Sequence, residues 1–309
     1  MENALSYVIP PVDVALLESE LNANTFIRHT GKGNNAIYSV NYHNAPHVLR
    51  EIGRLRELAF GLAGGGTGKP FDLDEHDTSE HCYQQLVVWS PEDKALIGGY
   101  RYIDCATLPN PSYLSTSHYF EFSDTFTTEY LPKTIELGRS FINPAFQPTV
   151  NPRKGMFALD NVWDGLGALI IENPHVQYFF GKVTMYAQYQ ADARNAILVF
   201  MSHFFPDNQA LVKPFSELIL NVTPEIQEFL SSIQQLEYKE AHKVLVQFCK
   251  HKGEFIPPLF NIYMNLSPSM KTFGTAVNSD FGGVEETGIL VTIADIYPEK
   301  KERHLSYTR

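Results

Sequence analysis

Apolar residues recur at the spacing of an amphipathic helix in several stretches of the chain. Over residues 46–62 they occupy one side of a helix, with Pro46 in the first turn and Arg50, Arg54 and Glu57 largely on the other side. The same spacing predicts a short helix within residues 119–131, helices over 158–172 and 187–205, and two helices within 223–251.

Apolar runs of strand length lie between these helices. Residues 82–89 and 95–104 flank a turn at 90–94, and they therefore predict a β-hairpin. Further strands are predicted over residues 36–42, 134–142, 176–183 and 288–294. Because helices alternate with strands, the predicted fold class is α/β (α+β), with a mixed sheet that has helices on both faces.

The pattern divides the chain into three parts. Residues 1–45 are predicted to form an N-terminal arm. Within it, residues 1–30 show little periodicity, so we expect them to be loosely organised. Residues 46–206 hold the regular alternation and predict a core, and residues 207–309 predict a helical and strand extension packed on it. The 309 residues, 44% of them hydrophobic, suffice for one large domain or two closely joined ones.

Charge and cysteine content narrow the function. The net charge of −11 argues against general nucleic-acid binding, although local basic patches remain at Arg153-Lys154 and within 239–252. The three cysteines are scattered, and no His/Cys/carboxylate cluster suggests a metal. With no visible signal peptide and no apolar run long enough for a membrane span, we expect a cytoplasmic protein, with peripheral contact at the inner membrane left open.

Charged residues interrupt the apolar segments at fixed spacings. The patterns are Arg56-x-x-x-Phe60, Asp74-x-x-Asp77, Gly98-x-x-Arg101 and Glu136-x-x-Arg139. Arg101, Glu136 and Arg139 fall in predicted buried strands, where a charge is costly unless it is paired. These residues therefore form a structural ion-pair network or handle a charged substrate.

Two loops can be compared with the patterns that bind phosphate groups, and only the second is a candidate. The glycine-rich run 63–70 departs from the phosphate-loop pattern, because Ala63 stands where glycine is needed and Pro70 where serine or threonine is needed. We expect a flexible loop there that could close over a ligand. The loop 143–155 joins a strand to a helix N-terminus, next to Arg153 and Lys154, and could hold the phosphates of a carrier cofactor. The alternative is an ordinary connecting loop.

The four spacings resemble those of acyl-homoserine-lactone synthases, a branch of the GNAT-like N-acyltransferases. A closer resemblance is to the ornithine-lipid and glycine-lipid N-acyltransferases, which often carry a hemolysin label. It covers roughly residues 46–295 and rests on strings at 52–60, 97–102, 136–140, 161–166, 180–182 and 257–263. The implied fold is a GNAT-like, mostly antiparallel central sheet with helices on both faces.

The resemblance implies transfer of a long-chain, or 3-hydroxy, fatty acyl group to the amine of glycine or ornithine in aminolipid synthesis. The GNAT pyrophosphate signature is not intact around residues 153–158, although Gly155 is present. This weakens the case for coenzyme A and is compatible with acyl carrier protein as donor partner. The donor substrate would be an acyl-phosphopantetheine thioester, with no permanently bound cofactor.

The resemblance also implies roles for the site residues. Acylation needs a neutral amine and donors for the oxyanion. Glu136 is the candidate proton acceptor, and Arg101 and Arg139 are candidates for binding the acceptor's carboxylate. The acyl arm is expected between strands 134–142 and 176–183. The candidate donor-binding residues are Phe141, Ile142 and Asn143, whose backbone N–H groups could hold the oxyanion, and Arg153, Lys154 and Gly155.

Other interpretations stay open. Arg56, Phe60, Asp74 and Asp77 are expected to bind or orient the substrate. Alternatively, Arg56, the two aspartates, Arg101, Glu136 and Arg139 form one structural network that fastens the first helix to the sheet. At the level of function, the alternatives are a non-catalytic lipid- or membrane-binding hemolysin-like protein and an acyltransferase for another amine, such as a homoserine-lactone precursor or a polyamine.

Overall fold

The computed structural model describes residues 5–305, which form two compact units interleaved along the chain. Unit 1 runs up to Ser115 and resumes over 132–177 and from Pro298 onward, whereas unit 2 comprises 116–131 and 178–297. The residues expected as a core, 46–206, are thus distributed over both units. The expected division into arm, core and extension stays a prediction.

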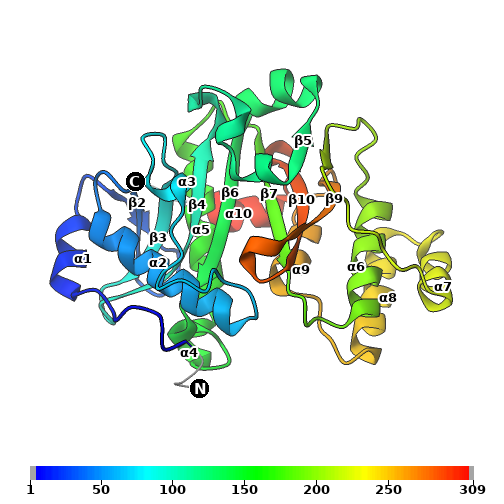
Figure 1. The fold of residues 1–309 in the computed structure, drawn as a ribbon, viewed down its shortest axis with the longest axis horizontal. Helices are drawn as coiled ribbons and strands as arrows, with labels where there is room; N and C mark the ends of the chain where they lie inside the picture. Colours follow the sequence, from blue (N-terminus) through cyan, green and yellow to red (C-terminus); the bar gives the residue numbers. More distant parts are fainter. Residues whose placement is uncertain (1–4, 306–309) are drawn as a thin grey trace. The chain divides into compact units, whose positions relative to one another are not determined.

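Unit 1 is built on antiparallel strands in the order β1-β2-β3-β4-β6. Figure 1 labels β2, β3, β4 and β6 of this series. Its strands are β1 (Phe26–His29), β2 (Ala36–Val40), β3 (Gln84–Ser90), β4 (Ala95–Asp104) and β6 (Thr134–Ile142). Its helices are α1 (Val14–Glu20), α2 (Pro46–Leu62), α3 (Glu75–Thr78), α4 (Pro152–Gly155), α5 (Ala158–Glu172) and α10 (Pro298–Leu305).

Helices α2 and α5 cover opposite faces of these strands. Successive side chains of a strand point to opposite faces. Leu86 of β3 lies under α5, where a Cβ on Gly165 would come within 2.1 Å of its side chain. The next residue back, Gln85, points the other way and donates a hydrogen bond to Asp77, beside α2. Polar side chains thus gather on the α2 face.

Strand β6 carries a bulge at the point where Arg139 leaves it. Gly99 pairs with Phe141 and Arg101 pairs with Gly138, so Arg139 and Ser140 together lie opposite one residue of β4. Arg139 has φ +49°, a left-handed conformation that is uncommon for a residue with a side chain. The bulge therefore redirects the Arg139 side chain out of the regular alternation of the strand.

Unit 2 contains antiparallel strands in the order β7-β10-β9 and a separate pair, β5 and β8. The strands are β5 (Phe120–Phe122), β7 (Tyr178–Met185), β8 (Val212–Pro214), β9 (Lys271–Asn278) and β10 (Val284–Thr292). The helices are α6 (Ala191–Phe204), α7 (Pro224–Ile233), α8 (Tyr238–His251) and α9 (Pro258–Met264), and residues Phe126–Tyr130 form one π-helical turn. Phe122, Phe126, Phe180 and Phe273 pack their rings together in its core.

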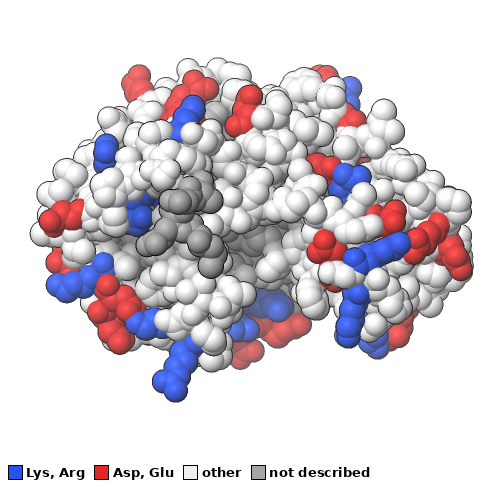
Figure 2. Space-filling model, turned by 60° about the horizontal axis from the view of Figure 1, so that its bottom comes forward, with Lys and Arg blue, Asp and Glu red and all other residues white. Residues whose placement is uncertain are grey.

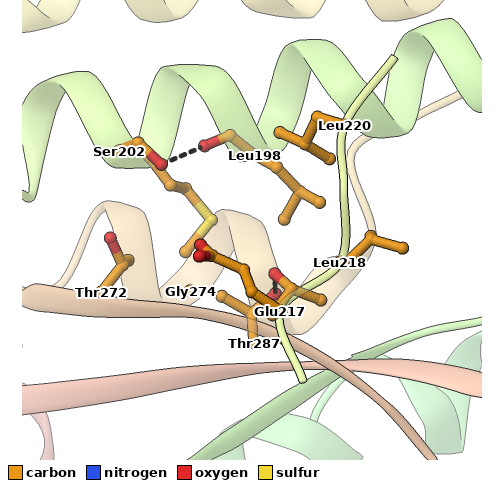
Figure 3. Close-up of a pocket in the computed structure, with 10 residues that line it drawn as sticks. Leu198, Ser202, Glu217, Leu218, Leu220, Thr272, Gly274 and Thr287 are labelled. Carbon is orange, nitrogen blue, oxygen red and sulfur yellow. Dashed lines mark hydrogen bonds between the residues drawn. The ribbon is translucent and has the colours of Figure 1, made fainter. Parts of the chain in front are cut away.

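A small cavity lies between α6 and the strands of unit 2 (Figure 3). Its volume is about 50 Å³, and Leu198, Met201, Leu218 and Leu220 supply apolar walls. The hydroxyl groups that line it already have partners within the unit. Ser202 donates to the Leu198 carbonyl, Thr272 to the Phe205 carbonyl, and Thr275 pairs with Thr287.

Most predicted elements are confirmed. The helix over 46–62, the hairpin of β3 and β4, the strand 134–142, the helix over 158–172 and the two helices within 223–251 are all present. The prediction of a loosely organised arm at residues 1–30 is wrong for its described part. Asp13 caps α1 there, and β1 pairs with β2. Within 119–131, β5 and the π-helical turn stand where one short helix was predicted. Among residues 5–305, no helix combines the length and hydrophobicity needed to cross a membrane.

The last described helix of unit 1, α10, is fastened to α5 by charge and by close backbone packing. Arg303 pairs with Asp160 at 2.7 Å, and His304 Nδ1 lies 2.9 Å from Asp164 Oδ1. Gly167 of α5 faces the α10 backbone so closely that a Cβ there would meet the His304 carbonyl oxygen at 2.3 Å. The absence of a side chain at position 167 therefore allows α10 to dock.

We expect Gly167→Ala to destabilise the protein by about 1–3 kcal/mol, because the added methyl group must displace backbone atoms. The matched control is Gly61→Ala in α2, where the nearest atom to a Cβ is the end of the Leu5 side chain at 3.0 Å. That variant should be neutral or gain up to about 1 kcal/mol from helix propensity. Urea unfolding measures both, and equal midpoints for the two variants would contradict the role of Gly167.

Candidate active site

The predicted charged residues of unit 1 meet in one buried cluster on the α2 face of the strands. Arg56 donates from Nε to Asp72 at 3.0 Å and from both terminal nitrogens to Asp77 at 3.1 Å. Arg101 donates to Asp74 at 2.7 Å and to Asp77 at 3.2 Å. Arg139 reaches Asp72 at 3.1 Å and Asp74 at 3.7 Å. Three arginines thus balance three aspartates.

The Asp74-x-x-Asp77 spacing has a local structural cause. The Asp77 N–H donates to the Asp74 carboxylate, and the Asp74 N–H donates to the Asp77 carboxylate. The two residues form a capping box at the start of α3, which fixes both carboxylates before they meet the arginines. The same two side chains therefore cap the start of α3 and neutralise Arg56 and Arg101.

Burial and charge act in opposite directions on this cluster. Burial by itself would raise the pKa of the Asp72 carboxyl, but the Arg56 and Arg139 guanidinium groups outweigh it and hold that pKa below its usual range. The pKa of Asp74 is lowered in the same way, chiefly by Arg101. Burial would lower the pKa of Arg56, yet Asp72 and Asp77 raise it instead. Asp72, Asp74 and Arg56 therefore stay charged at neutral pH.

Glu136 lies in a second set of hydrogen bonds. Tyr83 donates its hydroxyl proton to one carboxylate oxygen of Glu136, and the Ser115 hydroxyl donates to the other at 2.9 Å. The Ser115 backbone N–H in turn donates to the Tyr83 oxygen at 2.9 Å. Tyr83 and Glu136 are both fully buried. Burial, followed by the Glu136 charge, raises the pKa of Tyr83 well above its usual value.

Arg101 joins the two sets. Its guanidinium carbon lies 5.1 Å from the centre of the Tyr83 ring, within the range of a cation–π contact. The face of the ring thus contacts the arginine while its hydroxyl contacts Glu136. Through Tyr83, the position of Glu136 depends on the Arg101–Asp74–Asp77 contacts.

The structure corrects the expectation for Glu57 and the glycine-rich loop. Glu57 is fully buried rather than exposed. Its carboxylate accepts hydrogen bonds from the Thr67 and Gly68 backbone N–H groups at 2.9 and 2.8 Å, from the Thr67 hydroxyl, and from Tyr7. Burial, then Glu57, raises the pKa of Tyr7 to about 12. The loop at 63–70 therefore wraps a carboxylate of the protein itself.

The expected donor-binding residues lie at the end of β6 and in α4. The Asn143 N–H donates to the Ile97 carbonyl at 2.8 Å, so it is already engaged, whereas Phe141 and Ile142 pair with Gly99 and Gly98. Lys154 pairs with Asp93, Arg153 is exposed, and Gly155 is buried against the 146–148 backbone. Their role in donor binding stays a prediction.

Several members of the site were missed from the sequence. Asp72 carries no spacing signal of its own, although it contacts two of the predicted arginines. Gln85, Tyr83 and Ser115 are uncharged, so a search for buried charges passes over them. Phe60 was predicted, and it is buried in α2 together with Arg56. The catalytic and substrate-binding roles assigned to the predicted residues stay predictions.

The lowered pKa of Asp72 predicts the pH dependence of stability. A carboxyl whose pKa is lower in the folded than in the unfolded protein stabilises fully above the unfolded value of about 4, and this contribution is lost as the pH falls through the lower, folded value. We expect Asp72→Asn to cost about 3–5 kcal/mol at pH 7, because it leaves buried arginine charge uncompensated. The cost should shrink steadily below about pH 4.

Urea unfolding of the wild type and Asp72→Asn between pH 7 and pH 3 makes this measurement. The control is Glu121→Gln, which removes one partner of an exposed pair with Lys213 and should cost less than about 1 kcal/mol. A pH-independent difference between wild type and Asp72→Asn would contradict the lowered pKa.

Known proteins are similar in sequence to this chain over most of its length. Residues 55–153 match the acetyltransferase (GNAT) domain family. A protein of Bacteroides thetaiotaomicron named glycine N(alpha)-acyltransferase is 50% identical over 96% of this chain and 89% of its own length. A protein of the same name from Phocaeicola vulgatus is 46% identical over 96% of this chain and 92% of its own. The solved structure of FeeM, an N-acyl amino acid synthase from uncultured soil microbes, is 12% identical, covers 53% of this chain and 77% of that one, and has a TM-score of 0.29.

Identity of 46–50% over nearly the whole length is far above what a shared fold alone produces. The predicted membership among GNAT-like N-acyltransferases of the ornithine-lipid and glycine-lipid group is thereby confirmed, and the chain belongs to the glycine N(alpha)-acyltransferase family.

Proposed function

We propose that this protein transfers a fatty acyl group from a thioester to the amine of glycine. The observation that carries the proposal is the 50% identity, over 96% of the chain, to a protein named glycine N(alpha)-acyltransferase. The buried cluster of three arginines and three aspartates supports it, because the predicted acyltransferase spacings converge there. Between the two expected acceptors, the names of the relatives favour glycine over ornithine.

The reaction sets the requirements for the site. Glycine enters as an ammonium carboxylate and must lose one proton before its nitrogen can attack the thioester carbon. A carbon–nitrogen bond forms, the carbon–sulfur bond breaks, and the sulfur leaves as a thiol. Of the three ammonium protons, one stays on the amide, one ends on the thiol and one is released. The protein must therefore bind a zwitterion and accept a proton.

Within this proposal, Arg101, Glu136 and Arg139 position the site. Glu136 is fully buried, and both of its oxygens accept hydrogen bonds from hydroxyl groups. Arg101 is 3% exposed and already binds two carboxylates. Asp74 and Arg139 have the most exposed side chains of the arginine–aspartate cluster, at 31% and 15%. Any contact between this cluster and the substrate is therefore expected at Asp74 and Arg139.

We further propose acyl carrier protein as the donor. An acidic carrier needs basic side chains to dock against. In unit 2, Lys239, Lys243 and Lys250 are exposed along one side of α8. Figure 2 displays one face of the protein, on which basic and acidic side chains are interspersed. Within α8, Lys243 lies 2.8 Å from Glu240. Such a surface favours a partner that is recognised by local charge pairs.

The purified protein should convert glycine and acyl carrier protein charged with a long acyl chain into N-acylglycine, detected by mass spectrometry. Ornithine, a polyamine and a homoserine-lactone precursor serve as competing acceptors, and acyl coenzyme A as competing donor. Glycine should be preferred by at least tenfold in kcat/KM, since discrimination between polar acceptors depends on paired buried groups.

A vesicle-leakage assay accompanies the acyl-transfer assay. Leakage with no acyl transfer from any donor would replace this proposal by the lipid-binding alternative. Turnover of another amine in preference to glycine would keep the acyltransferase and overturn the acceptor.

Glu136→Gln separates positioning from proton transfer. Glutamine keeps one oxygen that can accept from Tyr83, and its amide group can donate to the Ser115 hydroxyl oxygen once that hydroxyl turns. A positioning role therefore predicts a loss of kcat below about tenfold, whereas loss of a general base costs about 10²–10⁴-fold. Tyr83→Phe breaks the same contact from the other side. The two changes should therefore be non-additive in the double variant. A folded Glu136→Gln protein with a hundredfold lower kcat would restore Glu136 as the base.

A further inference from the structure

Three neighbouring strands of unit 2 bring a lysine, a glutamate and an asparagine together. Lys182 of β7 lies 3.2 Å from Glu286 of β10, measured from Nζ to Oε1. Asn278 of β9 donates from its side-chain nitrogen to the same glutamate oxygen at 3.1 Å, and Thr184 of β7 donates to the other at 3.3 Å. Lys182 lies in the string at 180–182, one of those on which the family resemblance rests. No site role was predicted from the sequence for any residue of this cluster.

The cluster is nearly closed to solvent and carries an unused acceptor. The side chains of Lys182 and Glu286 are 11% and 3% exposed. Asn278 is 3% exposed, and its side-chain oxygen has no hydrogen-bond partner within residues 5–305. A buried amide oxygen without a donor is costly and rare in folded proteins. An N–H group of a bound ligand would satisfy it.

The surroundings hold the lysine in place and limit the size of a ligand. The Lys182 ammonium lies 4.8 Å from the centre of the Tyr119 ring. Gly288 of β10 pairs with Lys182 in the sheet, and a Cβ on it would meet the Phe120 ring at 3.0 Å. The cavity of Figure 3 borders Thr287, on the opposite face of β10, where the hydroxyl groups have partners.

We propose that Lys182, Glu286 and Asn278 bind the amino acid acceptor, an inference that rests on the proposed function. Glycine carries a carboxylate and an ammonium group separated by one carbon. Lys182 binds the carboxylate, while Glu286 and the Asn278 oxygen accept hydrogen bonds from the ammonium group. When glycine binds, the Lys182–Glu286 contact breaks. Lys182 then pairs with the carboxylate of the ligand, and Glu286 pairs with its ammonium group.

The arginine–aspartate cluster of unit 1 does not offer the same pair of binding groups to a zwitterion. Arg101 and Arg139 each lie against aspartates already, so a substrate carboxylate would have to displace a carboxylate of the protein. At the unit 2 cluster the zwitterion replaces one ion pair with two, and it also supplies the donor that Asn278 lacks. An acceptor with a second ammonium group, such as ornithine, would have to bury that charge near Phe120, without a counter-charge among these residues.

Glu286 also supplies the proton acceptor that the reaction requires. It takes one proton from the bound ammonium group, which leaves the nitrogen lone pair free to attack the thioester carbon. The carbon–nitrogen bond forms, the carbon–sulfur bond breaks, and a second proton of the former ammonium group passes to the leaving sulfur, which becomes the thiol. Glu286 releases its proton to solvent at the end of the cycle, so that atoms and charge balance. Glu286 and Lys182 contact the substrate and are catalytic residues in this scheme.

The test compares glycine with glycinamide, which has the same amine and no carboxylate. Wild type should prefer glycine by a factor of about 10–100 in kcat/KM, the range expected when a buried cation is paired by one ligand and not by the other. Lys182→Met should abolish this preference by raising the KM for glycine, with the KM for the acyl donor unchanged. Lys182→Arg should retain part of the preference.

A matched control is Lys213→Met, which removes the same charge from an exposed pair with Glu121 in the same unit and should leave the preference intact. A purely structural role of Lys182 would lower turnover of glycine and glycinamide equally, which would overturn the proposal. Glu286→Gln should lower kcat about 10²–10⁴-fold for both amines, as expected for loss of a general base. Wild-type-like kcat in that variant would remove Glu286 from the reaction.

The wild-type protein offers a measurement that does not depend on the folding of any variant. Saturating glycine should slow hydrogen exchange in peptides that cover 116–122, 178–186 and 276–290, whereas glycinamide should not. Unchanged exchange in these peptides, with glycine acylated normally, would overturn the site and leave the proposed function standing. No acylation of glycine by wild type would instead overturn the proposed function.

Discussion

The fold of unit 1 depends on the Arg56 guanidinium, which is fully buried and bonded to two aspartates. Removing this charge from water carries a large penalty, and only well-oriented carboxylates repay it. Asp72 and Asp77 take three of its N–H groups, and Asp77 is itself fixed by the capping box of α3. Because Arg56 belongs to α2 and Asp77 to α3, the ion pairs determine where both helices lie against the strands.

This constraint extends along the strands through shared partners. Asp77 also accepts hydrogen bonds from Arg101 of β4 and Gln85 of β3, and Asp72 contacts Arg139 of β6. Arg139 reaches Asp72 from a bulge in β6, where it adopts a left-handed backbone conformation. Such a conformation is costly for a residue with a side chain and persists where surrounding contacts determine it. The bulge and the ion pairs therefore act together. They fix the course of β6 and the position of Glu136 within that strand.

Most of the helices and strands around the arginine–aspartate cluster, and its main charged residues, could be predicted from the sequence. Which charged residues pair with one another could not. Periodicity predicted α2, α5 and the β3–β4 hairpin because each buries one regular face. It placed Glu57 on an exposed side, since the glycine-rich loop that covers Glu57 lies outside the helical repeat. Asp72 was missed because a lone aspartate has no spacing partner, and Tyr83 because its role depends on a hydroxyl group 53 positions from Glu136. The pair Lys182 and Glu286, 104 positions apart, becomes a pair only through the register of β7 and β10.

The two buried charge clusters differ in how fully their groups are neutralised by the protein. In unit 1 each arginine contacts two aspartates, so each charge keeps a second partner when one contact opens. In unit 2 Lys182 forms an ion pair with Glu286, and the neighbouring Asn278 has a side-chain oxygen without a donor within residues 5–305. A cluster of the first kind resists exchange with a ligand, because every contact is supported by a second one. A cluster of the second kind gains contacts when a zwitterion enters it. The low dielectric of the protein interior thus strengthens the fully paired cluster of unit 1 as part of the fold. The same low dielectric makes the cluster of unit 2 a candidate binding site.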